Sequence, residues 1–310
     1  MNFPWLEAVE SEFRVRFEQG RLPHALLLSG PRGTGKTLLA ESFTAGILCL
    51  EGGYPACGHC RSCQLLDTGA HPDRQLITFE EHPRTGELRK EIVVDQVRRL
   101  IASLNLTNTI SHRKAALIHP AEAMNKNSAN ALLKTLEEPP GDTILVLVSH
   151  DPARLPATIR SRCQNLYIRP PGPSTVLDWL GSEHGFDPAE SKAAMQAAAG
   201  SPLVALDLIN NGTTDQYRLL LDTLDDLGSG RMSSGAAMAA LGDIEPDLLW
   251  SWISLFTADR IKAGGQPHET ALQLSILQSA ADKNRKLMAT PVRKDFLLQD
   301  WLIQWARLRA

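Results

Sequence analysis

The chain has 310 residues, of which 43% are hydrophobic and 22% charged, and its 32 Lys and Arg residues nearly balance its 35 Asp and Glu residues. The net charge of -3 excludes a strongly basic nucleic-acid coat protein, so any contact with DNA is expected to be local or shared with partners. No apolar run approaches the roughly 18–20 residues that span a bilayer. The start, Met1 to Trp5, lacks the features of a signal peptide, and we expect a cytoplasmic protein.

The first half of the chain alternates short apolar runs with helical patterns, which predicts a parallel sheet with helices on both faces. The apolar runs predict strands at 25–29, 74–77, 115–118 and 143–148. Apolar periodicity and breaker residues predict helices at about 36–50, 93–104 and 127–137. The last of these helices is stopped by Pro139-Pro140.

The second half follows a break at Arg169-Pro170-Pro171-Gly172-Pro173, which predicts a linker. Beyond it the sequence shows helical patterns and no convincing strand, with two or three helices between 174 and 208. We therefore predict an α/β domain at 1–168, a small helical domain at 169–208 and an all-helical C-terminal domain at 209–310.

The segment from Gly30 to Thr37, GPRGTGKT, fits the G-x-x-x-x-G-K-[ST] phosphate-binding loop and lies between a predicted strand and a predicted helix. Its glycines let backbone N–H groups curl around phosphate oxygens at a helix N-terminus. In such a loop Lys36 reaches the β- and γ-phosphates and the Thr37 hydroxyl ligates Mg²⁺. We predict a site for ATP or ADP formed by Gly30, Gly33, Thr34, Gly35, Lys36 and Thr37.

Hydrolysis needs more than this loop, because a second apolar strand normally ends in an Asp that holds Mg²⁺. The strand predicted at 115–118 runs instead into His119-Pro120. Glu122 lies three residues beyond the first expected position and would need a rearranged backbone, and Asp151 is the other candidate. Spacing alone leaves both open, and we predict a site that holds nucleotide but turns it over poorly or not at all.

Four of the five cysteines crowd into one short stretch, and three of them have the spacing C-x-x-C-x-x-C. In a reducing compartment this cluster indicates metal ligation rather than disulfides. The predicted ligands are Cys49, Cys57, Cys60 and Cys63, which would close the tetrahedral sphere of a structural Zn²⁺. An iron–sulfur cluster is a rival occupant, and His59 could replace one cysteine. The module at 49–63 is predicted to be an insertion in the α/β domain.

The run from Asn130 to Pro140, NALLKTLEEPP, is followed by Ser161-Arg162-Cys163. With the phosphate-binding loop and the cysteine module, these motifs resemble the bacterial clamp-loader family, AAA+ proteins of the DNA polymerase III holoenzyme. The resemblance covers the α/β region and the helical lid after it, whereas the last hundred or so residues match only in length and helical character. It implies an AAA+ domain at 1–168, a lid at 169–208 and an oligomerisation collar at 209–310.

Two departures distinguish types within this family. The tau/gamma motor subunits carry an Asp-Glu pair where this chain has His119-Pro120, and a sensing Arg where it has Leu203. Both features resemble the delta-prime type, which lacks the acidic pair. The resemblance also places Ser149 and His150 in the first sensor region, so that Asp151 would lie past the metal.

The resemblance implies a stator in a hetero-pentameric ring with tau/gamma and delta subunits. Arg162 would act as an arginine finger in trans at the ATP site of a neighbouring subunit, so that the sliding clamp is loaded on primer–template DNA. The chain would then belong to a nucleotidyltransferase holoenzyme while its own ATPase activity is weak or absent. The alternatives are a catalytically active tau/gamma-like ATPase and a small-molecule kinase, although we find neither an acceptor-activating carboxylate nor a substrate lid for the kinase.

Overall fold

The computed structural model describes residues 3–265, 267–288, 290 and 292–308. It divides the chain into two compact units, Met1–Trp179 and Leu180–Ala310, with the division inside helix α7 (Pro173–His184). The finer division into three domains stays a prediction. Among the described residues, no helix is long and apolar enough to cross a membrane.

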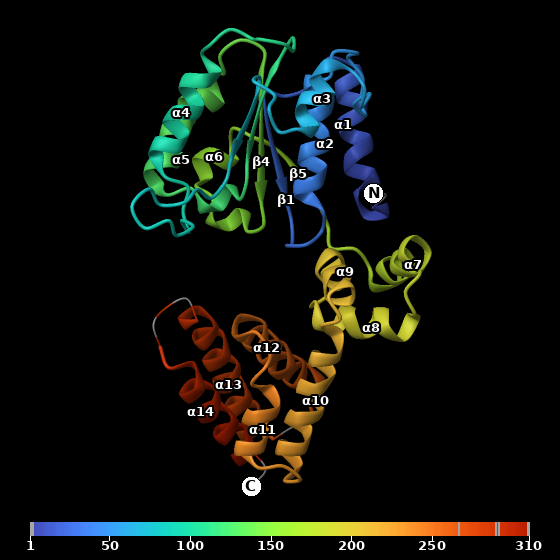
Figure 1. Ribbon diagram of the computed structural model, residues 1–310, viewed down its shortest axis with the longest axis vertical. Helices are drawn as coiled ribbons and strands as arrows, with labels where there is room; N and C mark the ends of the chain where they lie inside the picture. Colours follow the sequence, from blue (N-terminus) through green and yellow to red (C-terminus); the bar gives the residue numbers. More distant parts are fainter. Residues whose placement is uncertain (1–2, 266, 289, 291, 309–310) are drawn as a thin grey trace. The chain divides into compact units, whose positions relative to one another are not determined.

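The N-terminal unit contains a five-stranded parallel sheet in the order β2-β3-β4-β1-β5 (Figure 1). Its strands are β1 (Ala25–Ser29), β2 (Arg74–Ile77), β3 (Lys114–Ile118), β4 (Thr143–Ser149) and β5 (Gln164–Tyr167). The three inner strands are buried along their whole length, as a parallel sheet covered on both faces requires. The sequence did not predict β5, an edge strand in which Leu166 alone is buried.

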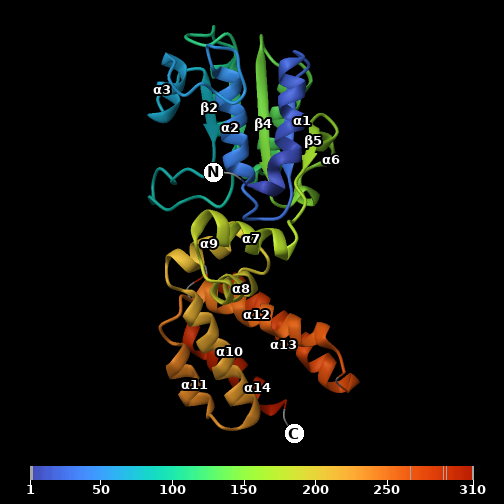
Figure 2. The same ribbon diagram turned by 90° about the vertical axis from the view of Figure 1, so that its right-hand side faces the viewer.

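Helices cover both faces of this sheet, as predicted (Figures 1 and 2). One face carries α4 (Val94–Leu104) and α5 (Lys126–Glu137), whose apolar sides pack into a core with β1, β3 and β4. The other face carries α2 (Lys36–Leu48) and α1 (Glu7–Glu18). Shorter elements are α3 (Arg61–Asp67), α6 (Ala157–Arg160) and the 3₁₀ turns Pro4–Leu6, Ala121–Ala123 and Pro152–Arg154.

Among its described residues the C-terminal unit has helices and no strand, as predicted. After α7 come α8 (Pro188–Ala197), α9 (Pro202–Asn210), α10 (Thr214–Ser229), α11 (Ser234–Leu241), α12 (Pro246–Ala263), α13 (His268–Leu287) and α14 (Lys294–Arg307). Three buried tryptophans join these helices through hydrogen bonds from the indole N–H to a backbone carbonyl, the third being Trp305 with the Leu224 carbonyl at 2.9 Å. Trp252 donates to the Ala197 carbonyl at 2.9 Å, and Trp301 donates to the Leu277 carbonyl at 3.0 Å.

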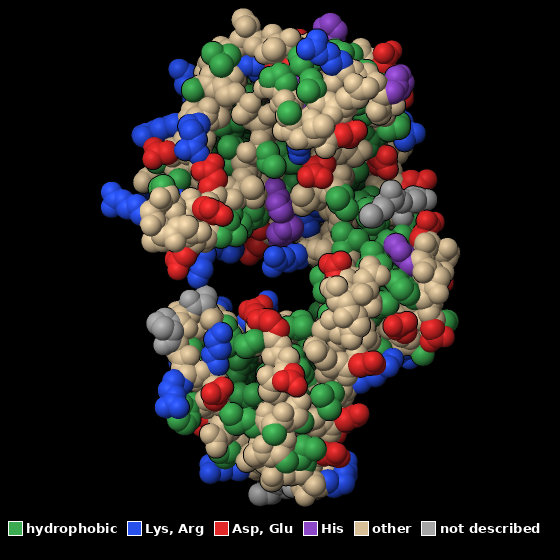
Figure 3. Space-filling model, viewed as in Figure 1, with side chains coloured by type: hydrophobic (Ala, Val, Ile, Leu, Met, Phe, Trp, Pro, Cys, Tyr) green, Lys and Arg blue, Asp and Glu red, His purple; other side chains and the backbone are tan. Residues whose placement is uncertain are grey.

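Acidic and basic side chains are interspersed on the face of the molecule drawn in Figure 3. Several form ion pairs within a unit, such as Arg99 with Glu80 at 2.6 Å and Arg285 with Asp247 at 3.2 Å. This mixture agrees with the nearly balanced charge of the sequence.

Candidate functional site

The phosphate-binding loop has the strand–turn–helix placement that the sequence predicted, because β1 ends at Ser29 and α2 begins at Lys36. Gly33 and Gly35 have φ values of 70° and 84°, which favour glycine. Gly30 has φ of 148°, and a Cβ there would lie 2.2 Å from the Ile168 carbonyl oxygen. The backbone geometry therefore requires glycine at these positions, in addition to the phosphate binding that the sequence predicts.

Lys36 lies in the interior of this loop and is only 2% exposed. Its Nζ donates to the Pro31 carbonyl and lies 3.4 Å from the Thr34 hydroxyl, while Trp5 donates from its indole to the Thr34 carbonyl at 2.9 Å. Burial lowers the pKa of Lys36 to about 8, although the negative charge of Glu122 opposes the shift. The loop thus keeps its cation close to its own backbone, with Thr37 half-buried in the first turn of α2.

Two histidines meet beside the loop, where β3 and β4 end. His119 follows β3 and His150 follows β4, their Nε2 atoms lie 3.3 Å apart, and their rings are nearly perpendicular at 86°. Burial lowers both pKa values, and the positive charge of Lys36 contributes to lowering that of His150 to about 4. Both imidazoles are therefore mainly neutral near pH 7.

Glu122 also lies beside the loop, which sequence spacing had made doubtful. The turn Ala121–Ala123 brings its carboxylate back, so that Oε1 accepts the backbone N–H of His150 at 3.0 Å. Among the described residues its buried Oε2 has no hydrogen-bond partner. Asp151 instead caps the turn Pro152–Arg154 by accepting the N–H of Ala153 at 3.2 Å. Of the two carboxylates that spacing left open, Glu122 is thus the one whose charge acts on Lys36.

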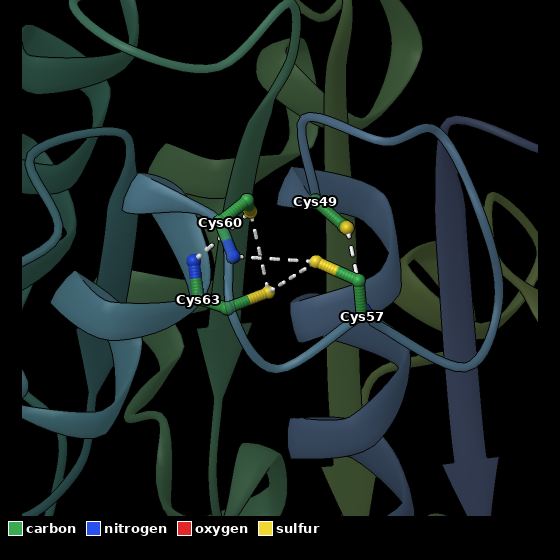
Figure 4. A group of neighbouring side chains, drawn as sticks. All are labelled: Cys49, Cys57, Cys60 and Cys63. Carbon is green, nitrogen blue, oxygen red and sulfur yellow. Dashed lines mark hydrogen bonds between the residues drawn. The ribbon is translucent and has the colours of Figure 1, made fainter.

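The side chains of the four predicted cysteines converge, and their four sulfur atoms all lie within 4.8 Å of one another (Figure 4). The sulfur of Cys63 lies 3.9 Å from that of Cys57 and 3.5 Å from that of Cys60. A tetrahedral zinc–thiolate site has sulfur–sulfur edges of about 3.8 Å, so the donor set fits this metal. His59 is exposed and its Nδ1 contacts the Cys57 carbonyl at 2.9 Å, outside this group.

A buried hydrogen-bond network joins the cysteine module to the rest of the unit. The hydroxyls of Ser62 and Ser111 donate to the Leu48 carbonyl at 2.7 and 2.6 Å, and His71 Nε2 lies 2.9 and 3.2 Å from them. Because His71 Nδ1 accepts the backbone N–H of Asp73, this pattern assigns the proton to Nε2. His71 therefore donates to the serines and is no base for them, so the network is structural. Its members are scattered along the chain, and sequence reasoning missed it.

Arg162 follows the short helix α6 and is anchored on two sides. Its Nε donates to Glu137 Oε1 at 2.6 Å, its Nη2 contacts the same oxygen, and its Nη1 donates to the Thr158 carbonyl at 2.9 Å. Glu137 is the last residue of α5. One third of the Arg162 side chain is exposed, at 33%.

Comparisons with known proteins give a consistent result. The family model described as DNA polymerase III, delta subunit matches residues 5–172. The DNA polymerase III subunit delta' of Pseudomonas aeruginosa is 36% identical over 97% of this chain and 89% of its own length. The subunit delta' of Escherichia coli is 33% identical over 84% of this chain and 76% of its own length.

A solved structure supports the fold alone. It is a DNA polymerase III gamma subunit-related protein from Thermotoga maritima, with a TM-score of 0.52 and 16% identity over 99% of this chain and 100% of that chain. The two delta' sequences have a higher identity to this chain than the solved structure does, and each match covers most of both proteins. The chain therefore belongs to the family of DNA polymerase III delta' subunits.

Proposed function

We propose that this chain acts as the delta-prime subunit of a clamp loader and supplies Arg162 to the ATP site of a neighbouring tau/gamma subunit. The observation that carries the proposal is the 36% identity to a delta' subunit over 97% of the chain. The ring would also contain delta, and the sliding clamp and primer–template DNA would be partners of the whole assembly. The protein would act in the cytoplasm.

The anchored guanidinium supports the role of Arg162. ATP hydrolysis develops negative charge around the γ-phosphate, and a finger from a neighbouring chain that stabilises this charge accelerates the reaction by about 10³–10⁵-fold. Arg162 is held at the end of α6 and keeps a third of its side chain exposed, so a phosphate of another chain can reach it.

For its own phosphate-binding loop, we propose binding of ATP or ADP without efficient turnover. Lys36 would meet the phosphates, Thr37 would ligate Mg²⁺, and the free Oε2 of Glu122 lies in the same neighbourhood. Mg²⁺ would neutralise phosphate charge there. Two neutral histidines follow β3 and β4, where a motor subunit needs an acid to hold the metal. If the isolated chain hydrolyses ATP and Lys36→Ala abolishes this hydrolysis, the result would favour the active-ATPase alternative.

For the cysteine module, we propose a structural Zn²⁺ held by Cys49, Cys57, Cys60 and Cys63. Four sulfur donors would fill a tetrahedral sphere and leave no position for a substrate. The network around His71 supports a structural role, because it connects the module to the end of α2.

The decisive experiment compares the wild-type chain with Arg162→Ala in a reconstituted clamp loader. We expect slower DNA-stimulated ATP hydrolysis, with the ring still assembled on gel filtration. Arg160→Ala is the matched control, because Arg160 is an exposed arginine at the end of α6, two residues before Arg162. Unchanged hydrolysis with Arg162→Ala would refute the finger role.

A further inference from the structure

Glu137 makes two of the three hydrogen bonds that hold Arg162. Its Oε1 accepts from Nε and from Nη2, on one edge of the guanidinium, while the Thr158 carbonyl accepts from Nη1. The contacts come from two different helices, α5 and α6. Together they fix both the position and the plane of the guanidinium.

This arrangement leaves part of the guanidinium for a ligand. An arginine has five N–H donors, and the three bonds above use three of them. Among the described residues, no partner is recorded for the other two. With 33% of the side chain exposed, these donors are available to phosphate oxygens of another chain.

We propose that Glu137 is a positioning residue for Arg162: it orders the guanidinium before the neighbouring ATP site is assembled around it. This inference rests on the proposed finger role of Arg162. Glu137 would touch neither nucleotide nor metal. Its contribution is to remove the freedom of a long side chain that otherwise has to be ordered in the transition state.

The size of the effect follows from that freedom. The rotamer entropy of an arginine side chain corresponds to about 10- to 30-fold in rate if it has to be lost during the reaction. A finger placed about 1 Å from its best position loses up to roughly 100-fold. We therefore expect loss of Glu137 to lower the Arg162-dependent part of the hydrolysis rate at least about tenfold.

The rate gained by ordering the Arg162 guanidinium should outweigh the rate lost because the Glu137 carboxylate offsets part of its positive charge. The Glu137 side chain is 49% exposed and Arg162 33%, so solvent screens the pair. Such exposed pairs add little to folding stability, so variants at Glu137 should fold normally. The adjacent Glu138 is exposed, carries the same charge and has no recorded bond to Arg162, which makes it a matched control among the described residues.

The test is a double-mutant cycle in the reconstituted clamp loader, with Glu137→Ala, Glu137→Gln, Arg162→Ala and Glu137→Ala/Arg162→Ala. We expect Glu137→Ala to lower kcat of the Arg162-dependent hydrolysis about tenfold with KM for ATP unchanged, because the contact acts in the transition state. Glu137→Gln should fall between Glu137→Ala and wild type, since its amide oxygen can accept the same two bonds but without the negative charge that strengthens them. Glu138→Ala should match wild type, and all variants should keep the wild-type unfolding midpoint.

The cycle separates this inference from the proposed function. If Arg162→Ala has no effect, the finger role itself is wrong. If Arg162→Ala slows hydrolysis but Glu137→Ala equals wild type, the positioning role is wrong. A Glu137→Ala effect that persists in full in the Arg162→Ala background would also overturn it, because Glu137 would then act on something other than Arg162.

Discussion

The protonation of Lys36 should set the pH dependence of nucleotide binding. Burial lowers the pKa of this amine from 10.5 to about 8 in the free chain. Phosphate oxygens would raise that pKa again, because an opposite charge nearby favours the protonated form. Below pH 8 the amine already carries its proton, so the affinity for the nucleotide should not change with pH through this group. Above pH 8 binding must take up a proton, so the affinity should fall.

The magnitude follows from the pKa of about 8. At pH 7 about nine-tenths of the Lys36 amines are protonated, and at pH 9 about one-tenth are. The affinity for ADP should therefore drop about tenfold between these values, or about 1.4 kcal/mol. The two histidines beside Lys36 and the nucleotide phosphates titrate below this window: the pKa of His150 is lowered to about 4, that of His119 is also lowered, and phosphate groups titrate near pH 6.

Calorimetric titration of the chain with Mg-ADP at pH 7, 8 and 9 would measure this change. Repeating it in two buffers of different ionisation enthalpy gives the proton uptake directly, which should approach one proton per nucleotide at pH 9. Lys36→Arg is the matched variant, because its charge persists at every pH used. An affinity that is the same at pH 7 and pH 9 without proton uptake would refute the reasoning, as would a pH dependence retained in Lys36→Arg.

Two further predictions concern the stability of the N-terminal unit. Cys60→Ser should abolish stoichiometric zinc in elemental analysis and lower the free energy of unfolding by at least about 2 kcal/mol. Cys163→Ser is the control and should keep the metal, because Cys163 lies outside the cluster. A wild-type chain without metal would contradict the assignment. Burial disfavours the Asp73 carboxylate, yet it accepts the backbone N–H groups of residues 109–111 at 2.8 Å, which lower its pKa below 3.8. The contribution of the Asp73 carboxylate to the free energy of unfolding is therefore complete above pH 3.8 and is lost as the pH falls through the lowered pKa. Asp73→Asn should lower the free energy of unfolding, measured in urea at pH 7, by about 1–3 kcal/mol, because one amide oxygen cannot accept from three donors. Asp67 is exposed, and if Asp67→Asn lowers the free energy of unfolding by the same amount, this account is wrong.

Long buried elements could be predicted from the sequence because their residue types decide their environment. The strands at 25–29 and 74–77 have the bounds that their apolar runs indicated. The helix predicted at 36–50 ends two residues early, at Leu48, because Cys49 takes an extended backbone conformation and turns toward the other cysteines. The cysteine cluster itself could be predicted, since its ligands lie close together in the chain.

Elements that depend on distant contacts could not be predicted. In helix α1 Phe13 alone is buried, and it stacks on Phe43 of α2 with ring centres 3.7 Å apart. The anchoring of Arg162 by Glu137 joins residues 25 positions apart. No local pattern marks either contact, because each partner alone has the character of an ordinary surface or helix residue.

The neighbourhood of Lys36 shows why spacing is a weak guide to the chemistry of this loop. A missing acid after β3 does not leave the lysine without a counter-charge, because the turn at 121–123 returns Glu122 to it. One oxygen of this carboxylate is already bonded to the backbone of His150, and both neighbouring imidazoles are mainly neutral. Such a carboxylate can balance a buried cation, and among the described residues its other oxygen has no hydrogen-bond partner. Charge balance at this loop therefore does not require catalysis, and under the function proposed above we expect this chain to keep the first and lack the second.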